Sequence, residues 1–157
     1  MAWEKLVSIE LTGTGDLIDT GTFDAKEKLF VEYYINASGS AGTNLRVNSD
    51  ASGNYAYRFS SNGQADTTLT TQGIVELRVL YGNSFGTMNI INKSAQAKLF
   101  IIHEVAQNTA SASNAPQRQQ NVTKWVDTSA QITSLQLSND GGGDFAAGST
   151  ITIWGTD

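Results

Sequence analysis

The most informative features of this sequence are the residues it lacks. Its 157 residues include no cysteine, one proline and one histidine. Without thiols, neither a disulfide framework nor a thiolate metal site can form. A nucleophile–base pair would have to use His103. The Gly-x-Ser-x-Gly letters at residues 82–86 begin in a predicted turn and lead into a predicted strand rather than a helix, so they do not form a nucleophile elbow. No glycine-rich loop is followed by a helix, as a phosphate-binding loop requires. No catalytic motif is therefore present, and we expect no enzymatic activity and no cofactor.

Charge is scarce as well. Charged residues make up 16% of the chain, against about 25% in an average globular domain. The net charge is −5, and the few basic residues are scattered, which disfavours nucleic acid and anionic membrane surfaces as partners. No apolar stretch approaches the ~18 residues of a membrane span, and residues 1–5 lack the features of a signal peptide. We expect a protein that is made in a cytoplasm and does not follow the standard export route.

What the chain does contain is a series of short runs in which apolar and polar residues alternate. Polar or glycine-rich turns separate these runs, and the chain has 15 glycines. The clearest runs cover residues 6–11, 28–37, 55–60, 74–80, 98–105, 122–126 and 149–154. The pattern predicts an all-β fold, with about nine to eleven strands in a two-sheet antiparallel β-sandwich of jelly-roll type and no substantial helix. We expect a single domain over residues 1–157.

The run at residues 98–105 allows two interpretations. Its alternating positions are apolar on both sides, with Leu99 and Ile101 on one and Phe100 and Ile102 on the other. A helix over residues 94–108 is possible, but the adjacent β-branched residues favour a strand buried on both faces. His103 is then a core or interface histidine. The carboxylates Glu32, Glu76 and Glu104 lie opposite apolar faces, where solvated side chains are expected rather than a catalytic pair.

The last third of the chain reads as two strands, over residues 131–138 and 149–154, joined by a polar turn at 139–144. Three oxygen-bearing side chains in this turn, including Asp140 and Asp144, could serve calcium, which takes six to eight oxygen ligands. The same residues with three glycines also suit a plain hairpin turn. We favour the turn and predict no metal site, with Asp140 and Asp144 as the ligands of the minority calcium hypothesis.

Candidate contact residues come from the aromatic and loop positions. Five aromatic residues could form a platform on which sugars stack, or could fill the space between two sheets: Tyr55, Tyr57, Phe59, Trp125 and Trp154. Residues 107–120 form one long polar stretch, read as a loop or arm, and such loops are often functional. The candidates for contact with a partner or a glycan are Trp3, Tyr55, Tyr57, Arg58, Pro116, Arg118 and Trp125.

Several segments resemble one group of proteins. They are Asn-Tyr-Ala-Tyr-Arg-Phe-Ser-Ser-Asn-Gly at 54–63, Lys-Trp-Val-Asp-Thr-Ser-Ala-Gln-Ile-Thr-Ser-Leu at 124–135, and the ending Gly-Ser-Thr-Ile-Thr-Ile-Trp-Gly at 148–155. The chain is similar to small β-rich virion proteins of tailed bacteriophages. The resemblance implies a jelly-roll protein on the virion surface, made in the host cytoplasm and usually assembled as a homo-oligomer, often a trimer.

Two functions are consistent with that resemblance. The first is a capsid decoration or cement protein, which braces the major capsid protein or other virion proteins and catalyses nothing. The alternative is a module of a tail fibre or spike that binds host cell-surface glycan through exposed aromatic residues and loops. The compact single domain favours decoration.

Overall fold

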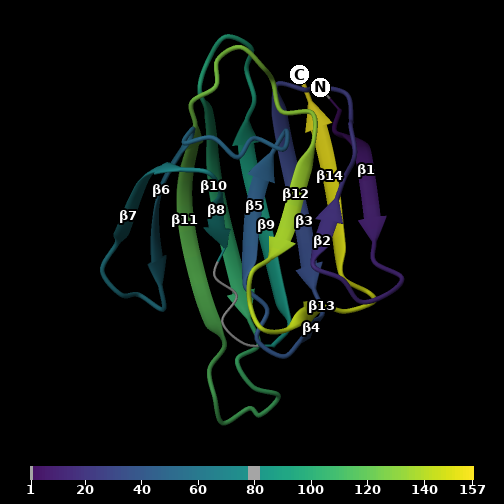
Figure 1. The fold of residues 1–157 in the computed structure, drawn as a ribbon, viewed down its shortest axis with the longest axis vertical. Coiled ribbons are helices and arrows are strands. Elements are labelled where there is room, and N and C mark those ends of the chain that lie inside the picture. Colours follow the sequence, from purple (N-terminus) through teal and green to yellow (C-terminus); the bar gives the residue numbers. More distant parts are fainter. Residues whose placement is uncertain (1, 78–81) are drawn as a thin grey trace.

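The computed structural model describes residues 2–77 and 82–157, and it is a β-sandwich of unequal layers (Figure 1). The larger sheet has eight strands in the order β1 (Glu4–Glu10), β14 (Thr150–Thr156), β3 (Lys28–Ile35), β9 (Ser84–Ile91), β10 (Lys98–Ala106), β11 (Gln117–Trp125), β6 (Tyr55–Ser61) and β7 (Thr67–Gln72). A four-stranded sheet follows the order β2 (Leu17–Asp19), β12 (Leu135–Asn139), β5 (Thr43–Val47) and β8 (Val75–Leu77). A small ribbon pairs β13 (Asp144–Phe145) with β4 (Ala37–Ser38).

All of these strand pairs are antiparallel, which confirms the predicted all-β sandwich. The described residues form more strands than expected because β2, β4, β8 and β13 are only two or three residues long. None of these residues is helical, so no described helix has the length and hydropathy needed to cross a membrane.

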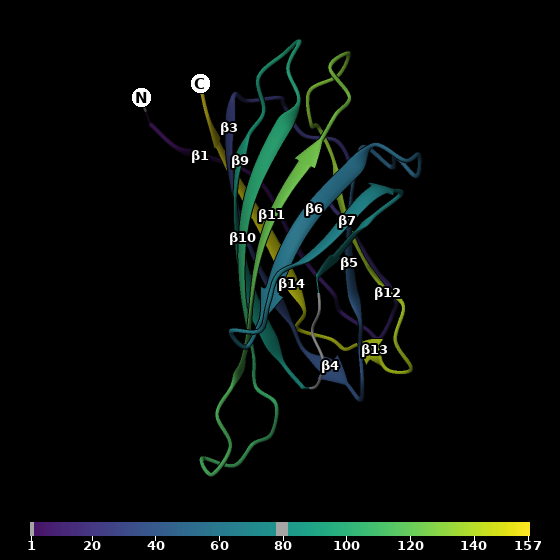
Figure 2. The ribbon, with the colours of Figure 1, turned by 90° about the vertical axis from the view of Figure 1, so that its left-hand side faces the viewer.

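The core lies between the two layers, which Figure 2 shows with β3, β9 and β10 on one side and β5 and β12 on the other. Alternation along β3 turns Leu29, Val31, Tyr33 and Ile35 inward, and all four are buried. Leu45 of β5 is equally buried on the opposing sheet. Burial of such side chains contributes about 1.5–3 kcal/mol each, so the core is the main source of stability.

The two closing strands do not form the hairpin that the sequence suggested. β12 lies between β2 and β5 in the smaller sheet, whereas β14 lies between β1 and β3 in the larger one. The turn at residues 139–144 therefore carries the chain from one layer to the other. It packs against residues 38–42, and a Cβ on Gly141 would lie 2.2 Å from the Ser40 carbonyl oxygen. Glycine is needed there for close approach of two backbones.

Two predicted segments change their bounds. The polar stretch at 107–120 is a shorter loop, residues 107–116, because β11 already begins at Gln117. Figure 1 shows this loop projecting beyond the end of the sandwich, away from both termini. In the run predicted at 74–80, β8 covers residues 75–77, and residues 78–80 lie outside the described part of the chain.

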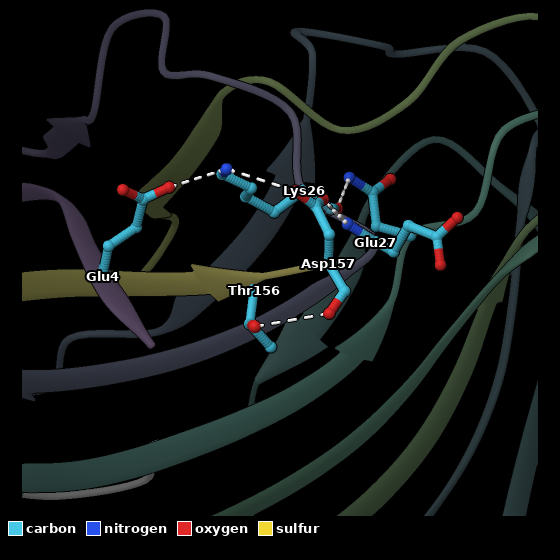
Figure 3. A network of polar contacts seen from close by, with 6 residues as sticks. Glu4, Lys26, Glu27, Thr156 and Asp157 are labelled. Carbon is cyan, nitrogen blue, oxygen red and sulfur yellow. Dashed lines mark hydrogen bonds and ion pairs between the residues drawn. The ribbon is translucent and has the colours of Figure 1, made fainter. Parts of the chain in front are cut away.

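The termini are joined by a small ionic network (Figure 3). The Lys26 amine lies 2.7 Å from Glu4 Oε1 and 3.3 Å from Asp157 Oδ2. The backbone amide of Glu27 donates to Asp157 Oδ1 at 3.3 Å. These contacts fix the start of the edge strand β1, and with it the backbone next to Trp3.

Candidate functional site

Strand β10 has one buried face and one bare apolar face. Phe100 and Ile102 point into the core, as a strand interpretation requires. Leu99, Ile101 and Val105 point the other way and are 55%, 52% and 39% exposed. The prediction of a strand is confirmed, but the prediction of burial on both faces is wrong because no layer formed by residues 2–77 and 82–157 covers the second face.

The neighbouring strands extend this bare face. Leu99 pairs with Ile91 of β9, and Ile101 pairs with Val122 of β11. Directly opposed residues of paired strands point to the same side of a sheet. We call this side, which faces away from the four-stranded sheet, the outer face. Its exposed apolar residues form one continuous area rather than isolated positions.

A groove of about 790 Å³ runs over this area. Its lining comes from six adjacent strands, β3, β9, β10, β11, β6 and β7, together with Trp3. We refer to it as the outer groove and to Ile91, Leu99, Ile101 and Val122 as its floor. The basic residues that line it are Lys28, Arg58 and Lys124, and its described lining includes no carboxylate.

Three of the proposed contact aromatics are inside the protein. Tyr55, Tyr57 and Trp125 are only 1%, 3% and 1% exposed. The hypothesis that these three rings form an exposed sugar-stacking platform is therefore wrong. Their strands, β6 and β11, turn them toward the core, so they fill the space between the sheets.

Trp125 is held by a network around Asp50. The Trp125 indole N–H donates to Asp50 Oδ2 at 2.7 Å, and Asn54 Nδ2 donates to the same oxygen at 2.9 Å. The Ser52 amide donates to Asp50 Oδ1 at 2.9 Å, and the Ser52 hydroxyl donates to it as well. Partial burial raises the pKa of Asp50, but the hydrogen bonds from Ser52, Trp125 and Asn54 outweigh it and hold that pKa below its usual range.

Lys98 lies near the same indole. Its side chain is buried, its amine donates to the carbonyl oxygens of Gln96 and Asp127, and the amine lies 5.6 Å from the centre of the Trp125 ring. Burial lowers the pKa of Lys98. Trp125 thus contacts both an anion and a cation inside the protein, which is a structural arrangement rather than a binding surface.

Glu104 is buried, contrary to the prediction of a solvated side chain. It follows Phe100 and Ile102 on the inward face of β10, and neither of its carboxyl oxygens has a partner of good hydrogen-bond geometry among the described residues. The Tyr33 ring lies across Gly86, where a Cβ would come within 2.2 Å of it. Burial raises the pKa of Glu104 to about 7, while the nearby Tyr33 hydroxyl lowers it by a smaller amount.

The remaining catalytic candidates do not converge. His103 is exposed on the outer face opposite Thr87 and Gln120, so the core interpretation of this histidine is wrong. Glu32 is exposed on the same face, whereas Glu104 points into the core and Glu76 belongs to the smaller sheet. These three carboxylates therefore cannot act on one glycosidic bond.

The loop candidates lie apart from the groove. Pro116 and Arg118 are exposed at the end of the sheet that carries the projecting loop. Asp140 is exposed and Asp144 begins β13, and within the described residues no three acidic, histidine or cysteine side chains gather where a metal could bind. Of the sequence candidates, Trp3, Tyr57 and Arg58 are among the residues that line the outer groove, and the Tyr57 side chain itself is buried.

The floor of the groove was missed by sequence reasoning. Leu99 and Ile101 were assigned to a core, and Val122 was noted only as the start of a strand. The available signal was the apolar character of both faces of β10, which is typical of a strand that is covered twice. The sequence matches no protein-family model, and no curated protein matches it.

Proposed function

We propose that this chain is a non-enzymatic architectural protein of a tailed-phage particle, a capsid decoration protein that braces neighbouring subunits through the outer face of its larger sheet. The observation that carries the proposal is the bare second face of β10. Contiguous exposed apolar patches are rare on monomeric proteins and mark interaction sites. A strand that is apolar on both faces is expected to be buried on both faces. Since the described part of this chain leaves one face of β10 exposed, we assign the burial of that face to another protein.

The placement of the carboxylates and the histidine favours an architectural protein over an enzyme. The carboxylates point to different sides of the sandwich, and the single histidine stands on an open surface. Three of the aromatic candidates for glycan contact in a tail fibre, Tyr55, Tyr57 and Trp125, are buried, whereas Trp3 is half exposed. The fibre hypothesis therefore keeps Trp3 but loses most of its aromatic platform.

Copy number in purified particles tests the proposal. A decoration protein is expected in hundreds of copies, which quantitative mass spectrometry measures against the major shell subunit. Density for the chain should lie on the shell, with the outer face of the eight-stranded sheet against a neighbour. A handful of copies located at the tail would contradict decoration and support the fibre alternative.

A further inference from the structure

The outer groove has the shape and charge to take one kind of partner. We propose that it binds an extended segment of a neighbouring protein, about seven residues long, whose aliphatic side chains are flanked by carboxylates. The inference deepens the proposed architectural function, on which it rests, by naming the chemistry of the partner at this surface.

The dimensions of the groove suit an extended chain. It crosses six strands from β3 to β7, and strands spaced at about 4.8 Å give it a length of about 24 Å. A fully extended segment advances about 3.3 Å per residue, so about seven residues fill it. Such a segment turns alternate side chains toward the floor.

The floor selects aliphatic side chains. Ile91, Leu99, Ile101 and Val122 are all at least two-fifths exposed without a partner. Covering each of them removes apolar surface from water, the dominant favourable term in protein association. Sugars and nucleic-acid bases stack on aromatic rings. The floor offers none, and among the described lining residues Trp3 is the one exposed ring, so the aliphatic floor dominates the surface.

The basic residues beside the floor favour a partner segment with acidic residues at its ends. Lys28, Arg58 and Lys124 line the groove without a carboxylate among the described lining residues, in a chain whose net charge is −5. Arg58 lies 3.6 Å from Asp66, but both side chains are more than half exposed, and such pairs contribute little. Carboxylates on the partner would complement these cations and improve both association rate and specificity.

The same charges disfavour a second copy packed face to face. In that arrangement two basic grooves would meet, and like charges across an interface cost several kcal/mol. Trp3 adds a further recognition element because it is half exposed and lines the groove. Tryptophan and arginine are the residue types most enriched at energetic centres of interfaces.

The test is an NMR titration of the full chain with two synthetic peptides. The first is Asp-Leu-Thr-Ile-Thr-Val-Asp, which places three aliphatic side chains on one face between acidic ends. The second has lysine in place of both aspartates. We expect amide shifts from the first peptide to cluster at residues 99–101 and 122–124, and the second peptide to bind at least about tenfold more weakly.

Two variants and a matched control locate the site. Ile101→Lys and Lys124→Glu should each weaken binding of the acidic peptide by about tenfold. Val105→Lys makes the same change on the same face of β10 but outside the groove, and should leave affinity within about twofold. All three positions are exposed, so the variants are expected to fold, which their spectra report directly.

Four results would overturn the inference. The first is equal affinity for both peptides, and the second is amide shifts elsewhere on the protein. The third is shifts at the floor that depend on protein concentration without peptide, which indicate binding of a second copy. The fourth is shifts at the floor caused by maltohexaose rather than by the peptides. If no peptide binds but Ile101→Lys is lost from particles while Val105→Lys is retained, the acidic segment is refuted and the architectural function stands.

Discussion

Glu104→Gln is expected to stabilise the protein by about 3 kcal/mol at pH 8 and to leave its stability at pH 4.5 nearly unchanged. The folded-state pKa of Glu104 is about 7, above its ordinary value of 4.5. Between these two values the folded protein holds a proton that the unfolded chain has released, so the free energy of unfolding falls as pH rises. The loss begins above pH 4.5 and is complete above pH 7.

The physical cause is a buried charge that the Tyr33 hydroxyl compensates only in part. Ionised Glu104 has lost its hydration shell, and no described residue supplies a hydrogen bond of good geometry in exchange. Glutamine has nearly the same shape and never ionises, so it removes the cost that appears at high pH. Urea unfolding at both pH values measures the effect.

Glu32→Gln is the matched control for this prediction. Glu32 is an exposed carboxylate on the outer face of the same sheet, so its substitution should change stability by less than about 0.5 kcal/mol at either pH. A stability difference between Glu104→Gln and the wild type that is the same at pH 4.5 and pH 8 would refute the role of Glu104.

Local alternation made the fold predictable. A period of two in Leu29, Val31, Tyr33 and Ile35 reports which face of β3 is buried, and the structure agrees. The pairing of strands is not local. The run at 131–138 and the run at 149–154 are neighbours in sequence, yet their strands join different sheets because the turn between them packs on residues 38–42.

The outer groove could not be placed from the sequence. The pattern of apolar residues shows that both faces of a strand are suited to burial, but it does not show which segment or which protein buries them. Both faces of β10 are apolar, and a single chain does not show whether the second cover is its own or another protein's. The burial of Glu104 was equally hidden. The alternation with Phe100 and Ile102 predicts that the Glu104 side chain points inward. The space that accommodates this side chain depends on Gly86 and the Tyr33 ring, which belong to other strands.

Asp50→Ala is expected to lower the free energy of unfolding by about 3–4 kcal/mol at pH 7. The Asp50 carboxylate accepts hydrogen bonds from Ser52, Asn54 and the buried Trp125 indole. Its removal leaves the indole N–H without a partner, at a cost of about 1–3 kcal/mol for that group alone. Asp66→Ala is the control, because its exposed pair with Arg58 at 3.6 Å should contribute less than about 1 kcal/mol.

The pH dependence of Asp50→Ala runs opposite to that of Glu104→Gln. Because hydrogen bonds hold the pKa of Asp50 below its ordinary 3.8, its contribution is complete above that value and is lost as pH falls through the lower folded-state pKa. The destabilisation caused by Asp50→Ala should therefore shrink in acid, whereas the stabilisation by Glu104→Gln grows in alkali. With one carboxyl stabilised as an anion and the other as an acid, these two groups together place the stability maximum of the wild type between about pH 4 and pH 5. Urea unfolding of the wild type and both variants from pH 2 to pH 8 measures these dependences. A destabilisation by Asp50→Ala that stays constant across this range would contradict the role of Asp50.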